Sequence, residues 1–254
     1  MQTHLIHFSA TGTTETVVRA VGKELSLNAT EHALLTTPLA PLSLGAGDIA
    51  VVGIPVYGGH VPKIAMKSIE NLTGNGSYAV AVAVYGNREY DDALVELTAA
   101  LQKQGFTIVG AAAFIGQHSI FPKVASGRPD AGDLAKAADF GRRCSEKIAA
   151  KTFPAITVKG KDPNATFSLS GGPMRPSADD GCTLCGACVA VCPVHCLSIR
   201  EGKLEKEEEK CFACAACVAA CPVGAQAFRG EVYEQRAAMF AQAFGARKEP
   251  EIFL

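Results

Sequence analysis

Eight of the ten cysteines in this 254-residue chain fall into two blocks with the same spacing. In each block three cysteines are separated by two residues, and a fourth follows after three more, with a proline directly behind it. The blocks are Cys182-x-x-Cys185-x-x-Cys188-x-x-x-Cys192-Pro193 and Cys211-x-x-Cys214-x-x-Cys217-x-x-x-Cys221-Pro222. This run is typical of cysteines that bind [4Fe-4S] clusters. The sequence therefore predicts that all eight are metal ligands and that the chain holds two [4Fe-4S] clusters.

Zinc is the rival metal, since paired Cys-x-x-Cys motifs also bind it. Zinc sites take four ligands in two pairs, whereas these are two blocks of four ending in Cys-Pro, so the spacing favours clusters. The second block has Ala215 where the first has Gly186, which we expect to shift backbone N–H groups near the sulfurs and the potential of the second cluster. Cys196, whose counterpart in the repeat is Ala225, and Cys144, within a helical stretch, are expected to serve packing.

A second chemical feature lies near the start of the chain, directly after a short apolar run. It is a hydroxyl-rich turn that opens a helix and contains Ser9, Thr11, Gly12, Thr13 and Thr14. Unpaired backbone N–H groups at a helix N-terminus attract anions, and the hydroxyls add donors without adding charge. The turn is therefore a candidate phosphate site, although the same residue types also serve as ordinary helix caps.

Two later loops follow apolar runs in the same way and combine glycines with tyrosines. Glycine permits close backbone approach, and tyrosine can lie against a flat ring. The candidate binding residues are Pro55, Val56, Tyr57, Gly58 and Gly59 in the first loop, and Tyr85, Gly86, Asn87, Arg88, Tyr90 and Asp91 in the second. The glycine pair also suits a plain tight turn, and Arg88 also suits an ion pair with Asp91. His60 and His118 are candidate proton donors, although loop histidines are more often simply solvated.

The elements that position these residues alternate between strands and helices over the first 150 or so residues. We expect strands at His4–Phe8, His32–Thr36, Asp48–Ile54, Tyr78–Tyr85 and Thr107–Ile115, and helices at Thr14–Leu25, Lys63–Leu72, Asp91–Gln104 and Gly132–Lys151. This order predicts an α/β fold with a doubly wound parallel five-stranded sheet, in which ligands bind at the carboxyl ends of the strands. We divide the chain into a domain at 1–151, a Gly- and Pro-rich linker at 152–176, a small α+β two-cluster domain at 177–230, and a docking helix and tail at 231–254.

The turn at residues 9–14 resembles the phosphate loop of flavodoxins, T/S-x-T-G-x-T, and the cysteine blocks resemble those of bacterial two-cluster ferredoxins. The flavodoxin resemblance implies that FMN binds between the three loops, with a glycine peptide, Gly58 or Gly59, near the flavin N5. The ferredoxin resemblance implies crossed ligation, in which Cys221 joins the first three cysteines and Cys192 joins the second three. The whole chain resembles fused flavodoxin-ferredoxin proteins of anaerobic bacteria and archaea.

This resemblance implies electron transfer between two [4Fe-4S] clusters and FMN, with a ferredoxin-type protein or an oxidoreductase as redox partner. Two alternatives stay open: an FMN-dependent reductase of an organic substrate, and a cluster-bearing scaffold with an empty flavodoxin-like domain. A net charge of −1 argues against a nucleic-acid partner. The lack of a long apolar run argues against a membrane span, and the cluster spacing of the cysteines favours a reducing cytoplasm. The oligomeric state is left open.

Overall fold

The computed structural model describes residues 1–163 and 174–254. The middle of the expected linker, residues 164–173, lies outside the described residues. The helices are α1 Thr13–Lys23, α2 Lys63–Ile69, α3 Ala93–Lys103, α4 Ala131–Ala150, α5 Ala187–Ala190, α6 Ala216–Ala219 and α7 Glu231–Phe244. The strands are β1 Thr3–His7, β2 Thr30–Ala33, β3 Leu42–Ser43, β4 Ile49–Pro55, β5 Leu72–Thr73, β6 Tyr78–Tyr85, β7 Thr107–Ile115, β8 Ser177–Ala178, β9 Leu197–Arg200, β10 Lys203–Lys206, β11 Gln226–Ala227 and β12 Glu251–Phe253.

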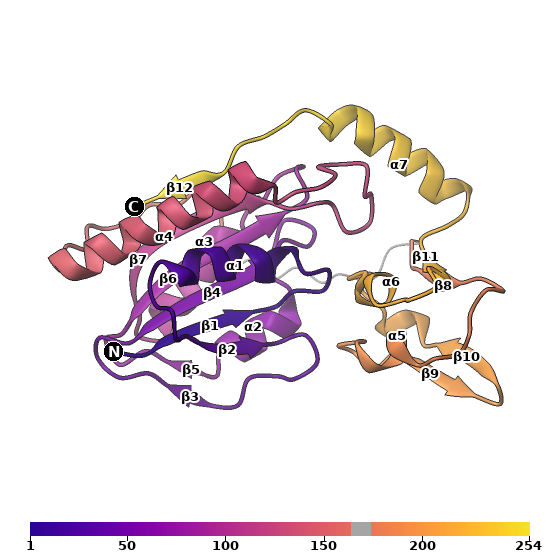
Figure 1. Ribbon diagram of the computed structural model, residues 1–254, viewed down its shortest axis with the longest axis horizontal. Helices are drawn as coiled ribbons and strands as arrows, with labels where there is room; N and C mark the ends of the chain where they lie inside the picture. Colours follow the sequence, from indigo (N-terminus) through magenta and orange to yellow (C-terminus); the bar gives the residue numbers. More distant parts are fainter. Residues whose placement is uncertain (164–173) are drawn as a thin grey trace.

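The N-terminal domain is built on a twisted sheet with the strand order β12-β7-β6-β4-β1-β2 (Figure 1). The five strands from β2 to β7 are parallel, and the order reverses between β1 and β4, which lie side by side at the centre. Every residue of β1 and β4 is buried, as expected for strands covered on both faces. The predicted doubly wound, flavodoxin-like α/β fold is therefore confirmed.

Helices cover both faces of this sheet (Figure 1). On one face, α1 and α4 bury Val17, Val18 and Val21 together with Phe140 and Cys144 in a single apolar cluster. Cys144 is fully buried, and burial raises the pKa of its thiol to about 12, which fits the expected packing role. On the other face, α2 and α3 bury a second cluster of Ala65, Ile69, Leu94, Leu97 and Leu101.

The C-terminal tail adds a sixth strand that the sequence analysis did not predict. Strand β12 pairs antiparallel with β7 at the edge of the sheet, with Ile252 opposite Ala112. The chain therefore leaves the N-terminal domain, builds the cysteine-rich domain and returns through α7 to the first domain (Figure 1). A five-stranded sheet was expected because a three-residue strand leaves no periodic signal in the sequence.

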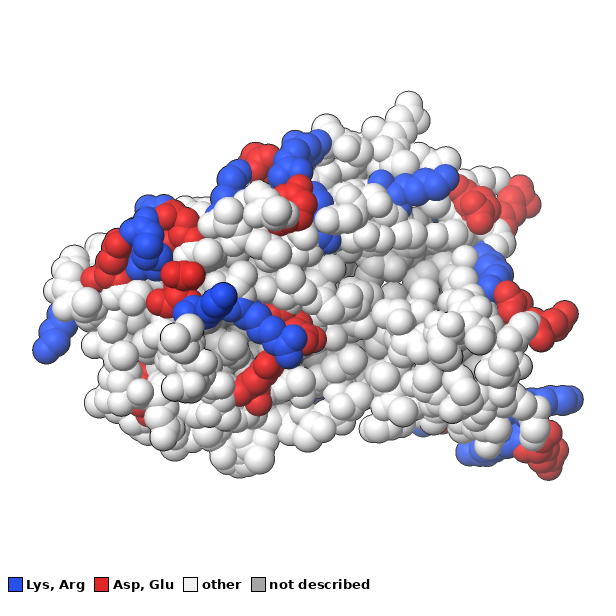
Figure 2. Space-filling model, in the orientation of Figure 1, with Lys and Arg blue, Asp and Glu red and all other residues white. Residues whose placement is uncertain are grey.

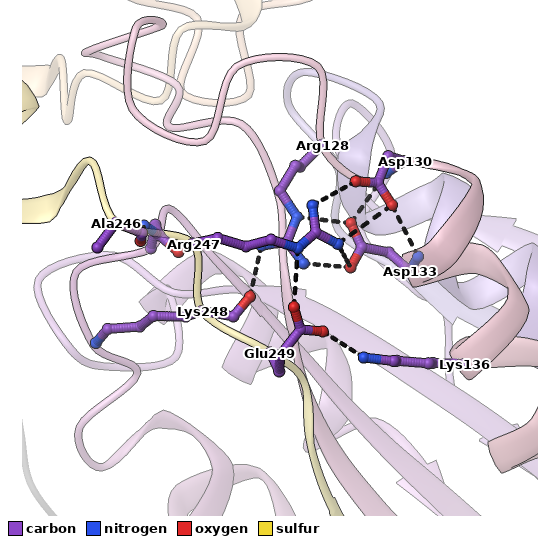
Figure 3. A network of polar contacts seen from close by, with 9 residues as sticks. Arg128, Asp130, Asp133, Lys136, Ala246, Arg247, Lys248 and Glu249 are labelled. Carbon is purple, nitrogen blue, oxygen red and sulfur yellow. Dashed lines mark hydrogen bonds and ion pairs between the residues drawn. The ribbon is translucent and has the colours of Figure 1, made fainter.

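A network of polar contacts fastens this returning tail (Figure 3). Arg128 is buried and forms a two-pronged ion pair with the fully buried Asp133 at the start of α4, with Nε 2.7 Å from Oδ2. Its Nη1 atom also donates to the Lys248 carbonyl oxygen at 2.6 Å. Arg247 pairs with Asp130 at 2.6 Å, and Glu249 pairs with Lys136. The tail is thus fixed to the N-terminus of α4 on both sides of Lys248.

Tyr90 provides a further link to the tail and a testable stability contribution. Its ring is fully buried against Tyr85, and its hydroxyl donates to Glu251 Oε2 at 2.8 Å. We expect Tyr90→Phe to lower the free energy of unfolding by about 1.5–3 kcal/mol, because it removes a hydrogen bond to a charged group. Thermal unfolding monitored by circular dichroism would measure this loss. Tyr78→Phe is the matched control, since the Tyr78 ring packs on Phe153 and its change should stay within about 0.5 kcal/mol.

The cysteine-rich domain is small and contains short elements around the two blocks. Helix α5 begins one residue before Cys188, and helix α6 begins one residue before Cys217, the third cysteine of each block. Strand β8 pairs with β11, and β9 pairs with β10. The charged run from Glu201 to Lys210 contains the β9–β10 turn at Glu201 and Gly202 and the whole of β10. Basic and acidic side chains alternate in small groups on the face shown in Figure 2.

Helix α7 leads from the cysteine-rich domain back towards the first domain. Tyr233 stacks on Phe228 and on Phe121, with ring centroids 5.9 Å apart in both pairs. Phe240 packs on Phe121 at 4.4 Å and on His118 at 5.6 Å. One face of α7 therefore contacts both domains through Tyr233 and Phe240.

Candidate functional site

A cavity lies at the carboxyl ends of the parallel strands, where the strand order reverses. We call it the strand-end cavity; its empty space, counted out to the open solvent at its mouth, is about 340 Å³. Segments following β1, β4, β6 and β7 all contribute to its wall. The lining residues are Ala10, Thr11, Thr13, Thr14, Pro55, Val56, Tyr57, Val84, Tyr85, Gly86, Gly116, Gln117 and Ser119. Its position is the one where doubly wound sheets bind their ligands.

Thr14 provides the strongest sign that this cavity accepts a polar ligand. The residue is buried, yet its hydroxyl has no hydrogen-bond partner. A buried hydroxyl without a partner costs about 1–3 kcal/mol, so such groups are rare in stable proteins. Gly12 at the N-cap of α1 has a φ of 84° and no side chain of its own to cap the helix. The first turn of α1 thus presents an unpaired hydroxyl and a helix N-terminus to the same cavity.

Ser9 and Gly12 support this loop without lining the cavity. The Ser9 hydroxyl accepts a hydrogen bond from the Glu15 backbone N–H at 3.1 Å, which is a capping contact within the loop. Gly12 adopts a left-handed conformation that disfavours other residues. The predicted phosphate loop therefore divides into two groups. Thr11, Thr13 and Thr14 reach the cavity, while Ser9 and Gly12 shape the turn.

The loop after β4 brings Pro55, Val56 and Tyr57 to the cavity and then turns away. Gly58 and Gly59 have φ values of 62° and 93° and form the tight turn between Tyr57 and His60. A side chain at Gly59 would lie 2.5 Å from Asp91 Oδ2, so the glycine also permits close packing of the next loop. Neither glycine lines the cavity. His60 Nδ1 lies 2.5 Å from the buried carboxylate of Glu96, which places its ring outside the cavity as well.

The loop after β6 differs from the prediction. Tyr85 and Gly86 line the cavity, but Asn87, Arg88, Tyr90 and Asp91 do not. Asn87 is buried and donates to the carbonyl oxygens of Phe244 and Ala246, both at 2.7 Å. Arg88 pairs with Asp91, as the alternative interpretation expected. Tyr90 is held in the core by its bond to the tail, so its ring is not available to a ligand. These residues hold the C-terminal tail, which the sequence analysis had treated as a separate element.

The loop after β7 supplies cavity-lining residues that the sequence analysis did not identify as binding residues. Gly116, Gln117 and Ser119 line the strand-end cavity. A side chain at Gly116 would lie 3.0 Å from Thr13 Cβ, so this glycine lets the loop approach the phosphate turn. The signal in the sequence is a glycine followed by polar residues directly after a fully buried strand, the same signal that identified the other loops.

A second, larger cavity separates the two domains; we call it the interdomain cavity. Its empty space, counted out to the open solvent at its mouth, is about 840 Å³, and it shares Thr11, Thr13, Gln117 and Ser119 with the strand-end cavity. Its first wall also includes His118 and Arg128. Its opposite wall is mostly apolar and comes from the second cysteine block, from β11 and the residue after it, and from α7: Ala215, Val218, Ala219, Ala227, Phe228 and Tyr233.

His118 lies in this wall as a neutral ring. Its Nδ1 atom accepts hydrogen bonds from the backbone N–H groups of Ile120 and Phe121, both at 3.2 Å, so the proton must sit on Nε2. Burial lowers the pKa of His118 to about 4, and the nearby Arg88 guanidinium lowers it further in the same direction. At neutral pH the ring can therefore donate a hydrogen bond from Nε2 and carries no charge.

This geometry makes a testable prediction about the titration of His118. Its ring should protonate with a pKa of about 4, measured by NMR from the pH dependence of its Cε1 proton, which His118→Asn would remove. Because the folded-state pKa lies below the ordinary value of 6.5, the unfolded chain binds this proton first. The stabilising contribution of the neutral ring is thus complete above pH 6.5 and declines as the pH falls towards 4. A midpoint near 6.5 in the folded protein would contradict the buried placement.

The two cysteine blocks fold into loops of the same conformation. Leu184 and Gly186 in the first loop have φ values of 54° and 79°, and their counterparts Ala213 and Ala215 have φ values of 57° and 68°. Left-handed backbone at these positions turns successive N–H groups inward, which creates the anion-binding concavity found at many iron–sulfur sites. Three of these residues have side chains that disfavour this conformation, so the loops accept strain to form it.

The second loop encloses a cavity with largely apolar walls and several sulfurs, which we call the second-block cavity. Cys211, Cys214 and Cys217 line it together with Cys192, the last cysteine of the first block. Burial raises the pKa of both Cys214 and Cys217 to about 12. The structure thus brings together the four cysteines that crossed ligation assigns to one cluster. In residues 1–163 and 174–254, no three His, Cys, Asp or Glu side chains are gathered to hold a single metal ion.

Two more sulfurs lie near the cysteine loops. Cys196 is buried, lines the second-block cavity and has its Sγ atom 3.4 Å from Cys192 Sγ. Its burial fits the expected packing role, and its contact with Cys192 was not foreseen. Cys221 Sγ accepts from the Gln226 N–H at 3.5 Å, and this backbone hydrogen bond is the main cause that lowers the pKa of Cys221.

Comparisons with known proteins agree with the cysteine assignment. Residues 181–225 match the model of the 4Fe-4S dicluster domain, a segment that contains all eight cysteines of the two blocks. The match is to an iron–sulfur family and so favours clusters over the zinc alternative. No curated protein was found to match the sequence.

Several solved structures are similar to the N-terminal part of the chain. A flavodoxin from the domain Archaea is 13% identical, covering 59% of this chain and 99% of its own, with a TM-score of 0.42. A short-chain flavodoxin associated with a non-canonical PDU bacterial microcompartment is 17% identical, covering 58% and 99%, with a TM-score of 0.42. An NADH:FMN oxidoreductase is 18% identical, covering 56% and 89%, with a TM-score of 0.37. The fold of this domain is defined by its own strand order, β12-β7-β6-β4-β1-β2.

The chain thus joins a flavodoxin-like α/β domain to a 4Fe-4S dicluster domain. The described part of the chain has no helix of the length and apolar character needed to cross a membrane.

Proposed function

We propose that this protein transfers electrons between two [4Fe-4S] clusters and FMN within one molecule. FMN occupies the strand-end cavity, with its phosphate at the first turn of α1. One cluster is bound by Cys182, Cys185, Cys188 and Cys221, and the other by Cys211, Cys214, Cys217 and Cys192. A low-potential redox protein, of the ferredoxin type or an oxidoreductase, exchanges electrons with the molecule.

The single observation that carries this proposal is a contact between the two candidate sites. Tyr57 lines the strand-end cavity, and its hydroxyl donates to the Cys214 carbonyl oxygen at 3.4 Å. Its ring also packs on Phe212, with centroids 6.1 Å apart. One side chain therefore contacts both the candidate flavin site and the loop of a candidate cluster. Such proximity suits electron transfer within the molecule, since transfer then becomes independent of protein concentration.

When bound, the clusters exchange single electrons, and FMN accepts one or two. The protein's own residues position these groups. The unpaired hydroxyl of Thr14 and the N-terminus of α1 bind the phosphate, while Tyr57 and Tyr85 border the space for the ring. Burial raises the pKa of Tyr85 to about 12, and burial also raises the pKa of Tyr57, so both hydroxyls stay protonated at neutral pH.

Anaerobic purification followed by iron and flavin analysis tests this function. We expect about eight irons and one FMN per molecule, because two [4Fe-4S] clusters hold four irons each. Anaerobic redox titration would then establish the order of the potentials and hence the direction of electron flow. About four irons per molecule would contradict the two-cluster assignment. Failure to bind FMN under saturating conditions would support the third alternative, a cluster-bearing scaffold.

A second candidate function is FMN-dependent reduction of an organic substrate, and the interdomain cavity favours it. This space adjoins the strand-end cavity and has the neutral His118 and the polar Gln117 and Ser119 on one wall. A substrate there would meet hydrogen-bond donors on one side and apolar surface on the other. Reduction of a quinone or a nitro compound with electrons from reduced ferredoxin would support this function. Rapid flavin reduction without turnover of either compound would favour the electron carrier.

A further inference from the structure

The two cysteine loops are equivalent in conformation but differ in exposure. In the first loop Thr183, Leu184 and Cys185 are exposed. Their counterparts in the second loop, Phe212, Ala213 and Cys214, are all partly buried. The same direction holds for the first cysteine of each loop, since Cys182 is partly buried and Cys211 is buried. The third and fourth cysteines differ in the other direction, since Cys188 and Cys192 are buried and Cys217 and Cys221 are partly buried. The first half of the second loop, residues 211–214, is therefore the part that is covered more than its counterpart in the first loop.

What covers the second loop is the wall of the candidate flavin site. Tyr57 contacts both the Cys214 carbonyl and the Phe212 ring. Across the interdomain cavity, Thr11 and Thr13 of the phosphate turn face a wall that contains Ala215, Val218 and Ala219 of the second block. Residues 182–192 line neither the strand-end cavity nor the interdomain cavity. Figure 1 shows the same arrangement, with α6 turned towards the sheet domain and β9 and β10 turned away.

The replacement of glycine by alanine in the second loop lies on this wall. Ala215 keeps the left-handed conformation that Gly186 adopts without strain, and it is 2% exposed. A left-handed alanine costs about 1 kcal/mol relative to glycine. The methyl group of Ala215 thus lies at a strained backbone position in the wall of the interdomain cavity. Gly186, its counterpart in the first loop, has no such methyl group.

From this asymmetry we infer the order of the redox centres. The cluster held by Cys211, Cys214, Cys217 and Cys192 exchanges electrons directly with FMN, and the cluster held by Cys182, Cys185, Cys188 and Cys221 faces the external partner. Tyr57 is the positioning residue at the junction between flavin and inner cluster. This inference rests on the proposed function and adds to it the path that electrons take.

The transfer balances one electron at a time. A reduced low-potential carrier protein loses one electron, which reduces the outer cluster. The outer cluster is reoxidised as the inner cluster is reduced, and the inner cluster is reoxidised as FMN gains the electron. A second passage completes the two-electron reduction of FMN, with protons taken from solvent. The same path in reverse delivers electrons from reduced FMN to the carrier.

The order can be tested by removing one cluster at a time. Cys214→Ala removes a ligand of the inner cluster, and Cys185→Ala removes the equivalent ligand of the outer cluster. Both proteins are loaded with iron, sulfide and FMN, and the remaining cluster and the flavin are each reduced by one electron. The microwave power that saturates the flavin EPR signal reports how close a paramagnetic cluster lies. We expect the fast relaxation of the wild-type flavin to be lost in Cys214→Ala and retained in Cys185→Ala.

The opposite result, or equal losses in both variants, would overturn the inference while leaving the proposed function intact. The complete absence of a flavin signal in the wild-type protein would instead overturn the proposed function, and this inference with it. The two failures are therefore distinguishable.

A second measurement uses the intact protein, in case either variant fails to fold. Slow oxidative loss of iron is followed by alkylation of the released thiols and mass spectrometry. The exposed loop should be attacked first, so Cys182, Cys185 and Cys188 should be alkylated before Cys211, Cys214 and Cys217. Simultaneous alkylation of both sets, or the reverse order, would count against an inner and an outer cluster.

Discussion

Replacing Thr14 with valine is expected to weaken FMN binding by about tenfold to a hundredfold without lowering the stability of the FMN-free protein. The loss corresponds to one hydrogen bond to a charged group, about 1.5–3 kcal/mol. Titration of FMN fluorescence under anaerobic conditions would measure the affinity. Chemical unfolding of the flavin-free protein would measure the stability.

The two expectations together distinguish a ligand-binding role from a structural one. In the FMN-free protein the Thr14 hydroxyl is buried and has no partner, so a methyl group of similar size removes an unsatisfied polar atom. The free energy of unfolding should therefore stay the same or rise by about 1 kcal/mol. A hydroxyl that served only the fold would show the reverse pattern, with stability lost and affinity kept.

Thr16→Val is the matched control in the same turn. The Thr16 hydroxyl already donates to the Gly12 carbonyl oxygen at 2.9 Å, and its residue is exposed. We expect FMN affinity to change by less than about twofold in this variant, since the hydroxyl makes a local helical bond. Equal loss of affinity in both variants would show that the effect comes from the turn as a whole.

The parts of the fold that sequence analysis predicted well are those with a strong local pattern. The bounds of β6 and β7 match the prediction because both are continuous apolar runs between turn residues. The candidate cysteine ligands were equally accessible to prediction, since spacing within a tight loop is a property of the sequence itself. The candidate phosphate turn was proposed for the same reason, because a hydroxyl-rich segment between strand and helix is a local signal.

The errors arise where a distant segment decides the role of a residue. Tyr90 and Asn87 have the types and position of ring-binding residues, and nothing nearby in the chain says otherwise. Their partners, Glu251 and the carbonyl oxygens of Phe244 and Ala246, belong to the C-terminal tail. The return of that tail depends on a three-residue strand and on side-chain pairs from separate elements. Such contacts become visible only when the chain is folded.

The difference in exposure between the two cysteine loops could not be predicted from the sequence, for a related reason. Both loops carry the same spacing, and Ala215 was the one visible difference in backbone freedom between them. The sequence analysis assigned this difference to the potential of the second cluster. In the structure it also marks the loop that packs against the N-terminal domain, a distinction that depends on how the domains meet.

One buried ion pair, between Arg128 and Asp133, supports the attachment of the C-terminal tail, and breaking that pair should have the largest effect on stability. We expect Asp133→Asn to lower the free energy of unfolding of the N-terminal domain by about 3–5 kcal/mol, because the buried Arg128 guanidinium would lose its counter-charge. Asp133 is fully buried and also accepts from the Asp130 N–H at 2.9 Å, so water cannot compensate. Thermal unfolding monitored by far-ultraviolet circular dichroism measures the loss.

The matched control is Asp139→Asn, the same change on the same helix in an exposed pair with Arg142. It should cost less than about 0.5 kcal/mol, since exposed ion pairs contribute little. Arg128 also donates to the Lys248 carbonyl oxygen, so disturbing its position should loosen the tail as well as α4. Proteolysis within residues 245–250 should therefore accelerate in Asp133→Asn and stay at the wild-type rate in Asp139→Asn. Equal stability of the two variants would show that the tail is held by β12 and α7 alone, with the ion pair contributing nothing to its attachment.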